Sequence, residues 1–127
     1  MTPPPRTILV CDDDGDIVDM TRLVLEGGGY RVIPCRSGSE ALQAVERARP
    51  DLILLDINMP VMNGLEFLQR IQKEPAYQPI PVIIISTEGK EEDTIRGLKM
   101  GAKGYVKKPF QASELHGLIE KVTATAS

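Results

Sequence analysis

The chain has 127 residues, of which 42% are hydrophobic and 26% charged, and this balance is typical of one folded domain with its own core. Its 15 basic and 18 acidic side chains give a net charge of −3, which argues against general nucleic-acid binding because that function needs a basic surface. The longest purely aliphatic runs, 52–55 and 82–85, are far too short to cross a membrane.

The beginning of the chain and its cysteines indicate the compartment. Residues 1–6 are predicted to be a flexible leader, and they lack the apolar segment of a signal peptide. Cys11 and Cys35 lie in apolar, strand-like segments. A disulfide between them is chemically allowed, but buried free thiols in a reducing compartment are the favoured interpretation. We therefore expect a cytoplasmic protein.

From residue 7 onward, short apolar runs alternate with amphipathic segments. The run 7–11 predicts a buried strand. Apolar residues at 17, 20, 23 and 24 predict a helix over 17–26 that ends at the glycines 27–29. A second strand is predicted over 30–35, at a sheet edge because it contains Pro34. Ser37 and Glu40 form a capping box, which predicts the start of a second helix.

The same alternation continues to the end of the chain. Strands are predicted over 52–55 and 82–85, and Leu65, Leu68 and Ile71 form the apolar stripe of the helix between them. A helix over 91–100 and a short strand over 104–107 follow. The last helix is predicted from about residue 113 to 122, so that the domain covers 7–122 and residues 123–127 form a tail.

Five strands, each followed by a helix, predict an α/β fold. The strands are almost entirely apolar, which is typical of a parallel sheet covered by helices on both faces. Because parallel crossovers are right-handed, covering both faces requires the chain to reverse direction across the sheet. The prediction is a doubly wound, five-stranded sheet with five helices. Periodicity alone does not give the strand order.

Polar side chains follow four of the predicted strands. Asp12, Asp13 and Asp14 follow the first strand, Asp56 the third and Ser86 the fourth, and the fifth leads into Lys108. In open parallel sheets, ligands bind at this edge. Clustered carboxylates repel one another, and a hard divalent cation such as Mg²⁺ relieves that repulsion. A carboxylate beside Mg²⁺ can attack phosphorus to form an aspartyl phosphate, with lysine and hydroxyl groups neutralising the phosphoryl oxygens.

Each of these residues also has a purely structural interpretation. Asp16 is expected to cap the first helix, and Asp19 to be a solvated residue within it. For Asp12, Asp13 and Asp14 taken alone, helix capping and metal binding are equally good explanations. Ser86 could bond locally, and Lys108 could be solvated. Zinc is disfavoured, because the sequence has no cluster of Cys and His residues and His116 is its only histidine.

The whole stretch 7–122 resembles the receiver domain of two-component response regulators, the chemotaxis-regulator-like fold. The segments that carry the resemblance are ILVCDDD at 8–14, ILLDINMP at 53–60, NG at 63–64, IST at 85–87 and GYVKKPF at 104–110. Together they are highly specific, and none would be so alone. The resemblance implies the strand order 2-1-3-4-5.

The resemblance also implies a role for each site residue. Asp56 would accept a phosphoryl group from a sensor histidine kinase or a phosphotransfer protein. Asp13 and Asp56 would bind Mg²⁺ directly, with the backbone carbonyl of Asn58, and Asp12 would bind it through water. Lys108, whose peptide bond to Pro109 is often cis in the family, would pair with the phosphorylated aspartate.

Two further residues would carry the signal. Ser86 resembles the switch hydroxyl that moves to the phosphoryl group, and Tyr105 the aromatic residue whose rotamer follows it. The surface formed by 91–100, 104–107 and the last helix would then control a protein partner, as a monomer or as a phosphorylation-dependent dimer. We expect no direct contact with nucleic acid and no membrane association. Such a domain catalyses only its own phosphorylation and dephosphorylation.

Two other functions share features with this sequence. The sequence DDDG at 12–15 also resembles the start of haloacid-dehalogenase-like phosphohydrolases, with Asp12 as the nucleophile, but a later acidic pair is missing and the chain is short for that fold with its cap. A flavodoxin-like flavin site would need a loop rich in Ser, Thr and Gly after the first strand, where three aspartates would repel the cofactor phosphate. The receiver interpretation is favoured over both.

Overall fold

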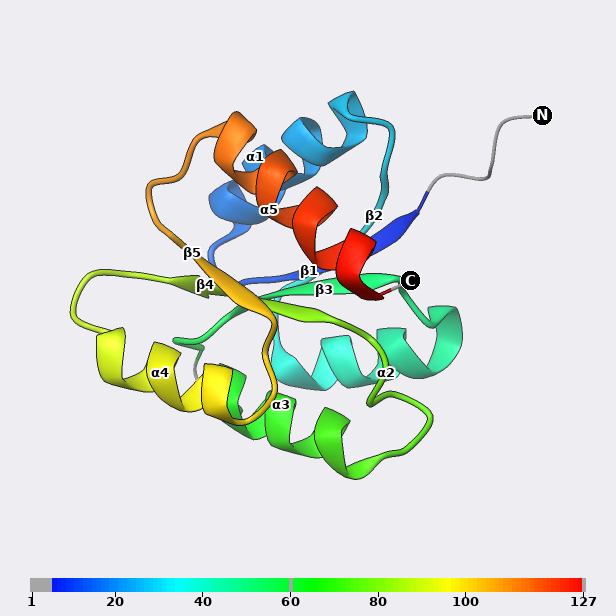
Figure 1. Cartoon of the computed structure of the whole chain (residues 1–127), viewed down its shortest axis with the longest axis vertical. Coiled ribbons are helices and arrows are strands. Elements are labelled where there is room, and N and C mark those ends of the chain that lie inside the picture. Colours follow the sequence, from blue (N-terminus) through cyan, green and yellow to red (C-terminus); the bar gives the residue numbers. More distant parts are fainter. Residues whose placement is uncertain (1–5, 60, 127) are drawn as a thin grey trace.

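A computed structural model describes residues 6–59 and 61–126, with side chains as far as Thr123. The predicted leader therefore lies outside the described residues, except for Arg6. Strands and helices alternate strictly along the chain (Figure 1). In order they are β1 (Thr7–Cys11), α1 (Gly15–Gly27), β2 (Arg31–Cys35), α2 (Gly38–Ala48), β3 (Leu52–Asp56), α3 (Gly64–Lys73), β4 (Val82–Ser86), α4 (Glu91–Lys99), β5 (Gly104–Lys107) and α5 (Ala112–Ala126).

The five strands form one parallel sheet in the order β2-β1-β3-β4-β5. This confirms the predicted fold class, the strand order and the edge position of the strand that contains Pro34. The order reverses between β1 and β3, since the chain first adds β2 on one side of β1 and then continues on the other side. Ligands bind at such a reversal in open α/β sheets.

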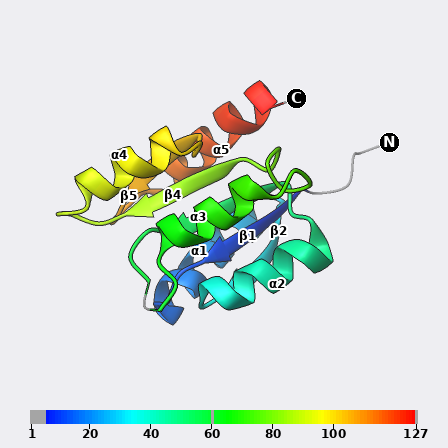
Figure 2. The same ribbon diagram turned by 90° about the horizontal axis from the view of Figure 1, so that it is seen from below.

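Helices cover both faces of the sheet, α1 and α5 on one and α2, α3 and α4 on the other (Figures 1 and 2). The alternation of side chains along each strand divides the core in two. Ile8 and Val10 of β1 pack with Leu25 of α1 and with α5, whereas Leu9 and Cys11 pack with α2 and α3. Every residue of β3 and β4 is buried, as expected for central strands that are covered on both faces.

The predicted first helix is present as α1, but its buried face is offset from its apolar pattern. Val18, Thr21 and Leu25 face the core, whereas Met20 and Leu23 are 44% and 73% exposed. Positions 18, 21 and 25 have the same helical spacing as the apolar positions 17, 20 and 24, but one of them is a threonine. Val24 is the residue of the apolar pattern that packs against the core, and it is only partly buried.

The helix ends agree with the prediction in part. Ser37 caps α2 by accepting a hydrogen bond from the Glu40 N–H (3.1 Å), but the Glu40 carboxylate accepts from the Arg36 N–H instead of completing the box with Ser37. Helix α1 ends at the predicted glycines. Helix α5 runs to Ala126, four residues past the predicted end, because the alanines and threonines there are compatible with a helix.

The two cysteines are free and buried, as predicted. They are register partners on β1 and β2, and they belong to the core on the α2–α3 face. Burial raises the pKa of the Cys11 thiol far above its ordinary value and that of Cys35 to about 11. Both side chains therefore act as small apolar residues of the core.

Candidate phosphoacceptor and metal site

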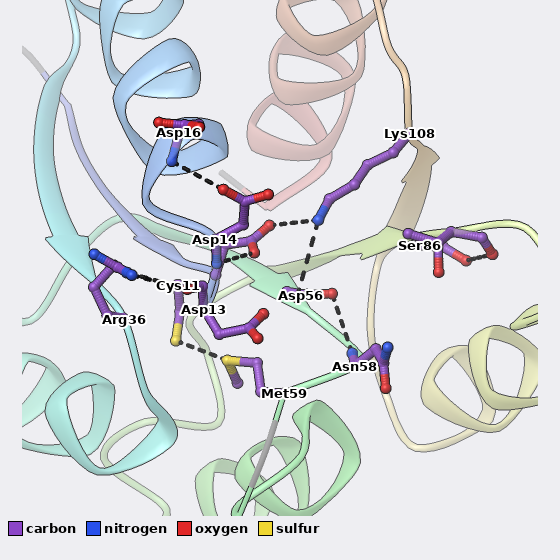
Figure 3. A network of polar contacts seen from close by, with 12 residues as sticks. Cys11, Asp13, Asp14, Asp16, Arg36, Asp56, Asn58, Met59, Ser86 and Lys108 are labelled. Carbon is purple, nitrogen blue, oxygen red and sulfur yellow. Dashed lines mark hydrogen bonds and ion pairs between the residues drawn. The ribbon is translucent and has the colours of Figure 1, made fainter.

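The polar residues predicted to follow the strands meet at one edge of the sheet. Asp12 and Asp13 follow β1, Asp56 ends β3, and Lys108 follows β5 (Figure 3). Parallel strands present their carboxyl ends on the same side, so residues distant in sequence come together here without any long loop. The site lies at the reversal of strand order between β1 and β3.

Three carboxylates form the acidic part of the site. Asp12, Asp13 and Asp56 each present one oxygen, and these oxygens all lie within 4.8 Å of one another. Asp12 and Asp56 are buried, whereas Asp13 is exposed, so the cluster opens to solvent on the Asp13 side. An all-oxygen set with an open side fits Mg²⁺, which keeps several water ligands and binds few carboxylates.

Lys108 places a positive charge inside the cluster. Its Nζ lies 2.7 Å from Asp12 Oδ2 and 4.0 Å from Asp56 Oδ2, and its side chain is 17% exposed. The backbone N–H of Asp14 also donates to Asp12 Oδ1 at 3.0 Å. Asp12 is thus held by a cation and a backbone donor, and the closest ion pair of Lys108 is with Asp12 instead of Asp56. The peptide bond between Lys108 and Pro109 is cis.

The carboxyl group of Asp56 has an unusually high pKa. Burial raises the pKa of this carboxyl to about 7, and the neighbouring Asp12 adds to the rise. The backbone N–H of Asn58, which donates to Asp56 Oδ1 at 3.1 Å, and the Lys108 ammonium oppose it. Repulsion between Asp12 and Asp56 is therefore incompletely compensated by the protein, which is the electrostatic setting that a divalent cation would relieve.

The loop after β3 is held close to Asp56 by a glycine. A Cβ on Gly64 would lie 2.6 Å from the Asp56 carbonyl oxygen and from Ile57 Cα. Asn63 caps α3 by accepting from the Glu66 N–H at 2.9 Å, and the Gly64 N–H donates to the Ile57 carbonyl. The predicted pair at 63–64 thus fixes where α3 starts and lets its backbone approach the end of β3.

Ser86 is at the predicted strand end, but its hydroxyl is engaged elsewhere. Ser86 Oγ lies 2.8 Å from Thr94 Oγ1, and no hydrogen bond joins this hydroxyl to the side chains of Asp56 or Lys108 among the described residues (Figure 3). Tyr105 on the neighbouring strand β5 is 53% exposed and points outward. These two residues are therefore placed near each other, with the serine turned away from the acidic cluster.

The prediction that Asp16 caps the first helix was wrong. Asp14 is the cap, and its Oδ1 accepts a hydrogen bond from the Asp16 N–H at 3.0 Å. The helix begins two residues earlier than its apolar pattern indicates, at Gly15, so the cap moves with it. Asp19 is exposed, as expected of a solvated residue.

Sequence reasoning missed two residues beside the site. Arg36 follows β2, and its Nε and Nη2 both donate to the Asp13 carbonyl oxygen, at 3.2 and 3.1 Å. Its place at a strand end was a signal that could have revealed it. Thr94, the partner of Ser86, lies inside α4 and is 5% exposed. No spacing pattern pointed to it, because its role depends on how the helix packs on β4.

Residues 8–120 match the family model described as the response regulator receiver domain. The chain belongs to this family. The resemblance drawn from its motifs is thereby confirmed, and the receiver domain is a signalling domain of two-component systems. The alternative of a phosphohydrolase with Asp12 as nucleophile is not supported, and Asp12 is fully buried with its carboxylate held by Lys108 and the Asp14 N–H.

Named relatives and solved structures agree with this assignment. The chain is 37% identical over 117 residues to the phosphate regulon transcriptional regulatory protein PhoB of Escherichia coli K12. The aligned region covers 92% of this chain and 51% of PhoB. It thus spans about half the length of this curated relative.

Two solved structures resemble the receiver domain over nearly its whole length. They are the receiver domain of NtrX from Brucella abortus (32% identity, TM-score 0.88) and the chemotaxis protein CheY4 of Vibrio cholerae (34% identity, TM-score 0.87). Each match covers 93% of this chain and 98% of the other.

Among residues 6–59 and 61–126, no helix has the length and apolar character needed to span a bilayer.

Proposed function

We propose that this receiver domain accepts a phosphoryl group on Asp56 from the phosphohistidine of a sensor kinase or a phosphotransfer protein, in a reaction that needs Mg²⁺. The observation that carries the proposal is the position of Asp56, whose carboxylate ends β3 within 4.8 Å of two other carboxylates and within 4.0 Å of Lys108. Asp12, in contrast, is already bound at 2.7 Å by that lysine. Asp56 is therefore the better nucleophile.

Asp13 and Asp56 would hold the ion directly, with the backbone carbonyl of Asn58 as a third ligand and Asp12 acting through water. The open side at Asp13 leaves room for water and for phosphoryl oxygens. When bound, Mg²⁺ neutralises the charge that develops on the phosphoryl oxygens during transfer. It would also keep Asp56 ionised, since a nearby cation lowers the pKa of a carboxyl group.

The protein side of the reaction follows from the hydrogen bonds of Asp56. The Asn58 N–H orients the carboxylate through Oδ1. In transfer, a carboxylate oxygen of Asp56 attacks phosphorus, the O–P bond forms, and the N–P bond of the donor breaks, leaving the electron pair on the imidazole nitrogen. Lys108 lies close enough to move from Asp12 toward the new phosphoryl oxygens, which would stabilise the product.

Ser86 and Tyr105 would report this event to the surface. A phosphoryl oxygen on Asp56 offers Ser86 an acceptor stronger than a neutral hydroxyl. Turning of Ser86 toward it would free space beside α4 for the exposed Tyr105 ring, since both side chains line one cavity of about 250 Å³. The surface of α4, β5 and α5 would then bind its protein partner differently. A monomer and a dimer formed through that surface are both compatible with this mechanism.

The domain would act as a cytoplasmic switch, with catalysis limited to its own phosphorylation and dephosphorylation. A small acyl phosphate tests the proposed site without the kinase. We expect the wild-type chain to gain one phosphoryl group only with Mg²⁺ present, detected by intact mass or phosphate-affinity electrophoresis. Asp56→Asn should remove the signal.

A matched control is Asp19→Asn, which neutralises an exposed aspartate on α1 and should be labelled as fast as wild type. Asp12→Asn separates the two candidate nucleophiles. In this variant we expect slow labelling that still maps to Asp56, because Asp12 only helps to hold Mg²⁺ and does not accept the phosphoryl group. Normal labelling of Asp56→Asn, or a modified peptide containing Asp12, would show that the acceptor was assigned to the wrong residue.

A further inference from the structure

The Ser86 hydroxyl is held in place by a chain of two hydrogen bonds. Ser86 Oγ and Thr94 Oγ1 are 2.8 Å apart, and Thr94 Oγ1 donates to the Lys90 carbonyl at 2.8 Å. A threonine hydroxyl has one proton, and that proton is used toward Lys90. Ser86 is therefore the donor and Thr94 the acceptor in the bond between them. The other acceptor within reach of Ser86, the Thr87 carbonyl, is more distant at 3.4 Å.

This arrangement is well protected from water. Ser86 and Thr94 are 4% and 5% exposed. Thr94 lies in the first turn of α4, and its backbone N–H also binds the Lys90 carbonyl at 3.0 Å, so the position of its hydroxyl is fixed by the start of the helix. The bond thus joins the end of β4 to the first turn of α4.

We propose that Thr94 is a positioning residue that sets the resting state of the switch, by competing with the phosphoryl group for the single proton of Ser86. The inference rests on the proposed function of Asp56. Ser86 cannot donate to Thr94 and to a phosphoryl oxygen at once, so activation must break the bond to Thr94. Its strength is then part of the free-energy difference between the resting and the activated domain.

Thr94→Val is the decisive variant, because valine has nearly the same shape and lacks the hydroxyl. The Lys90 carbonyl keeps its bond from the residue 94 N–H, so no acceptor is left without a partner. Beryllofluoride with Mg²⁺ serves as the stand-in for the phosphoryl group, and its affinity is measured by calorimetry. Thr94→Val should bind it about three- to tenfold more tightly than wild type, as expected for one lost hydrogen bond in the resting state.

Three further variants test whether the effect comes from the Thr94 hydroxyl or only from the packing of the side chain. Thr94→Ser retains the hydroxyl and should bind as wild type does. Thr94→Ala lacks it and should shift affinity in the same direction as valine, which covers the case that valine folds poorly. In an Ser86→Ala background, Thr94→Val should have no effect, because the bond is already absent.

The outcomes distinguish the proposal from the function on which it rests. Wild-type protein that does not bind beryllofluoride would overturn the proposed function of Asp56, and the role of Thr94 with it. Wild-type protein that binds, with Thr94→Val and Thr94→Ala at the same affinity, would overturn only the role of Thr94. A shift that persists in the Ser86→Ala background would also overturn it, since the effect would then not pass through Ser86.

Discussion

At the scale of single residues, the buried carboxyl of Asp56 makes a prediction about stability and pH. Its pKa is about 7 in the folded domain and near 3.8 in an unfolded chain. Between these values the folded state binds more protons than the unfolded state, so the free energy of unfolding decreases as pH rises from about 4 to above 7. Asparagine does not ionise, so Asp56→Asn avoids this decrease in the free energy of unfolding. The variant should be more stable than wild type at pH 8, by roughly 1–2 kcal/mol.

Urea unfolding in EDTA at pH 5 and pH 8 measures this difference. The gain of Asp56→Asn should be clearly smaller at pH 5 than at pH 8, because only part of the wild-type loss of stability is present at pH 5. Asp19→Asn is the control for removing an exposed charge. A gain that is equal at the two pH values would contradict the raised pKa of Asp56.

At the scale of secondary structure, the start of α1 yields a matched pair of variants. Asp14 caps the helix through its side chain, whereas Asp16 lies in the first turn and contributes only its backbone N–H to that bond. Asp14→Ala should lower the free energy of unfolding by about 1 kcal/mol, the usual cost of losing a cap. Asp16→Ala should lower the free energy of unfolding by no more than a few tenths of a kcal/mol, because it removes only a negative charge near the helix N-terminus. Equal costs would contradict the cap assigned to Asp14.

The same helix shows where sequence reasoning succeeds and where it stops. The strands and the residues that end them were predicted correctly, because an apolar run followed directly by Asp56 or Ser86 is a local signal. The cap of α1 was placed at Asp16 instead of Asp14, since several aspartates compete for the start of the helix. The hydrogen bond between Ser86 and Thr94 could not be predicted from the sequence, because it depends on the packing of α4 against β4.

At the scale of the whole molecule, the proposed Mg²⁺ site joins two neighbouring strands of the sheet. Asp12 and Asp13 follow β1 and Asp56 ends β3, and these strands are neighbours in the sheet. The oxygens come together only when both strands are in place, so the ion should bind the folded state and hardly the unfolded chain. Folding and binding are then linked.

Urea unfolding at pH 8 with and without Mg²⁺ tests this linkage. At a free Mg²⁺ concentration ten times the dissociation constant, wild type should gain about 1.4 kcal/mol. Because a domain of this size unfolds in one cooperative step, the midpoint should rise while the slope of the transition stays the same. Asp13→Asn should reduce the gain strongly, whereas Asp19→Asn should retain it. If Asp13→Asn gains as much as wild type, the ion binds elsewhere and the proposed Mg²⁺ site is wrong.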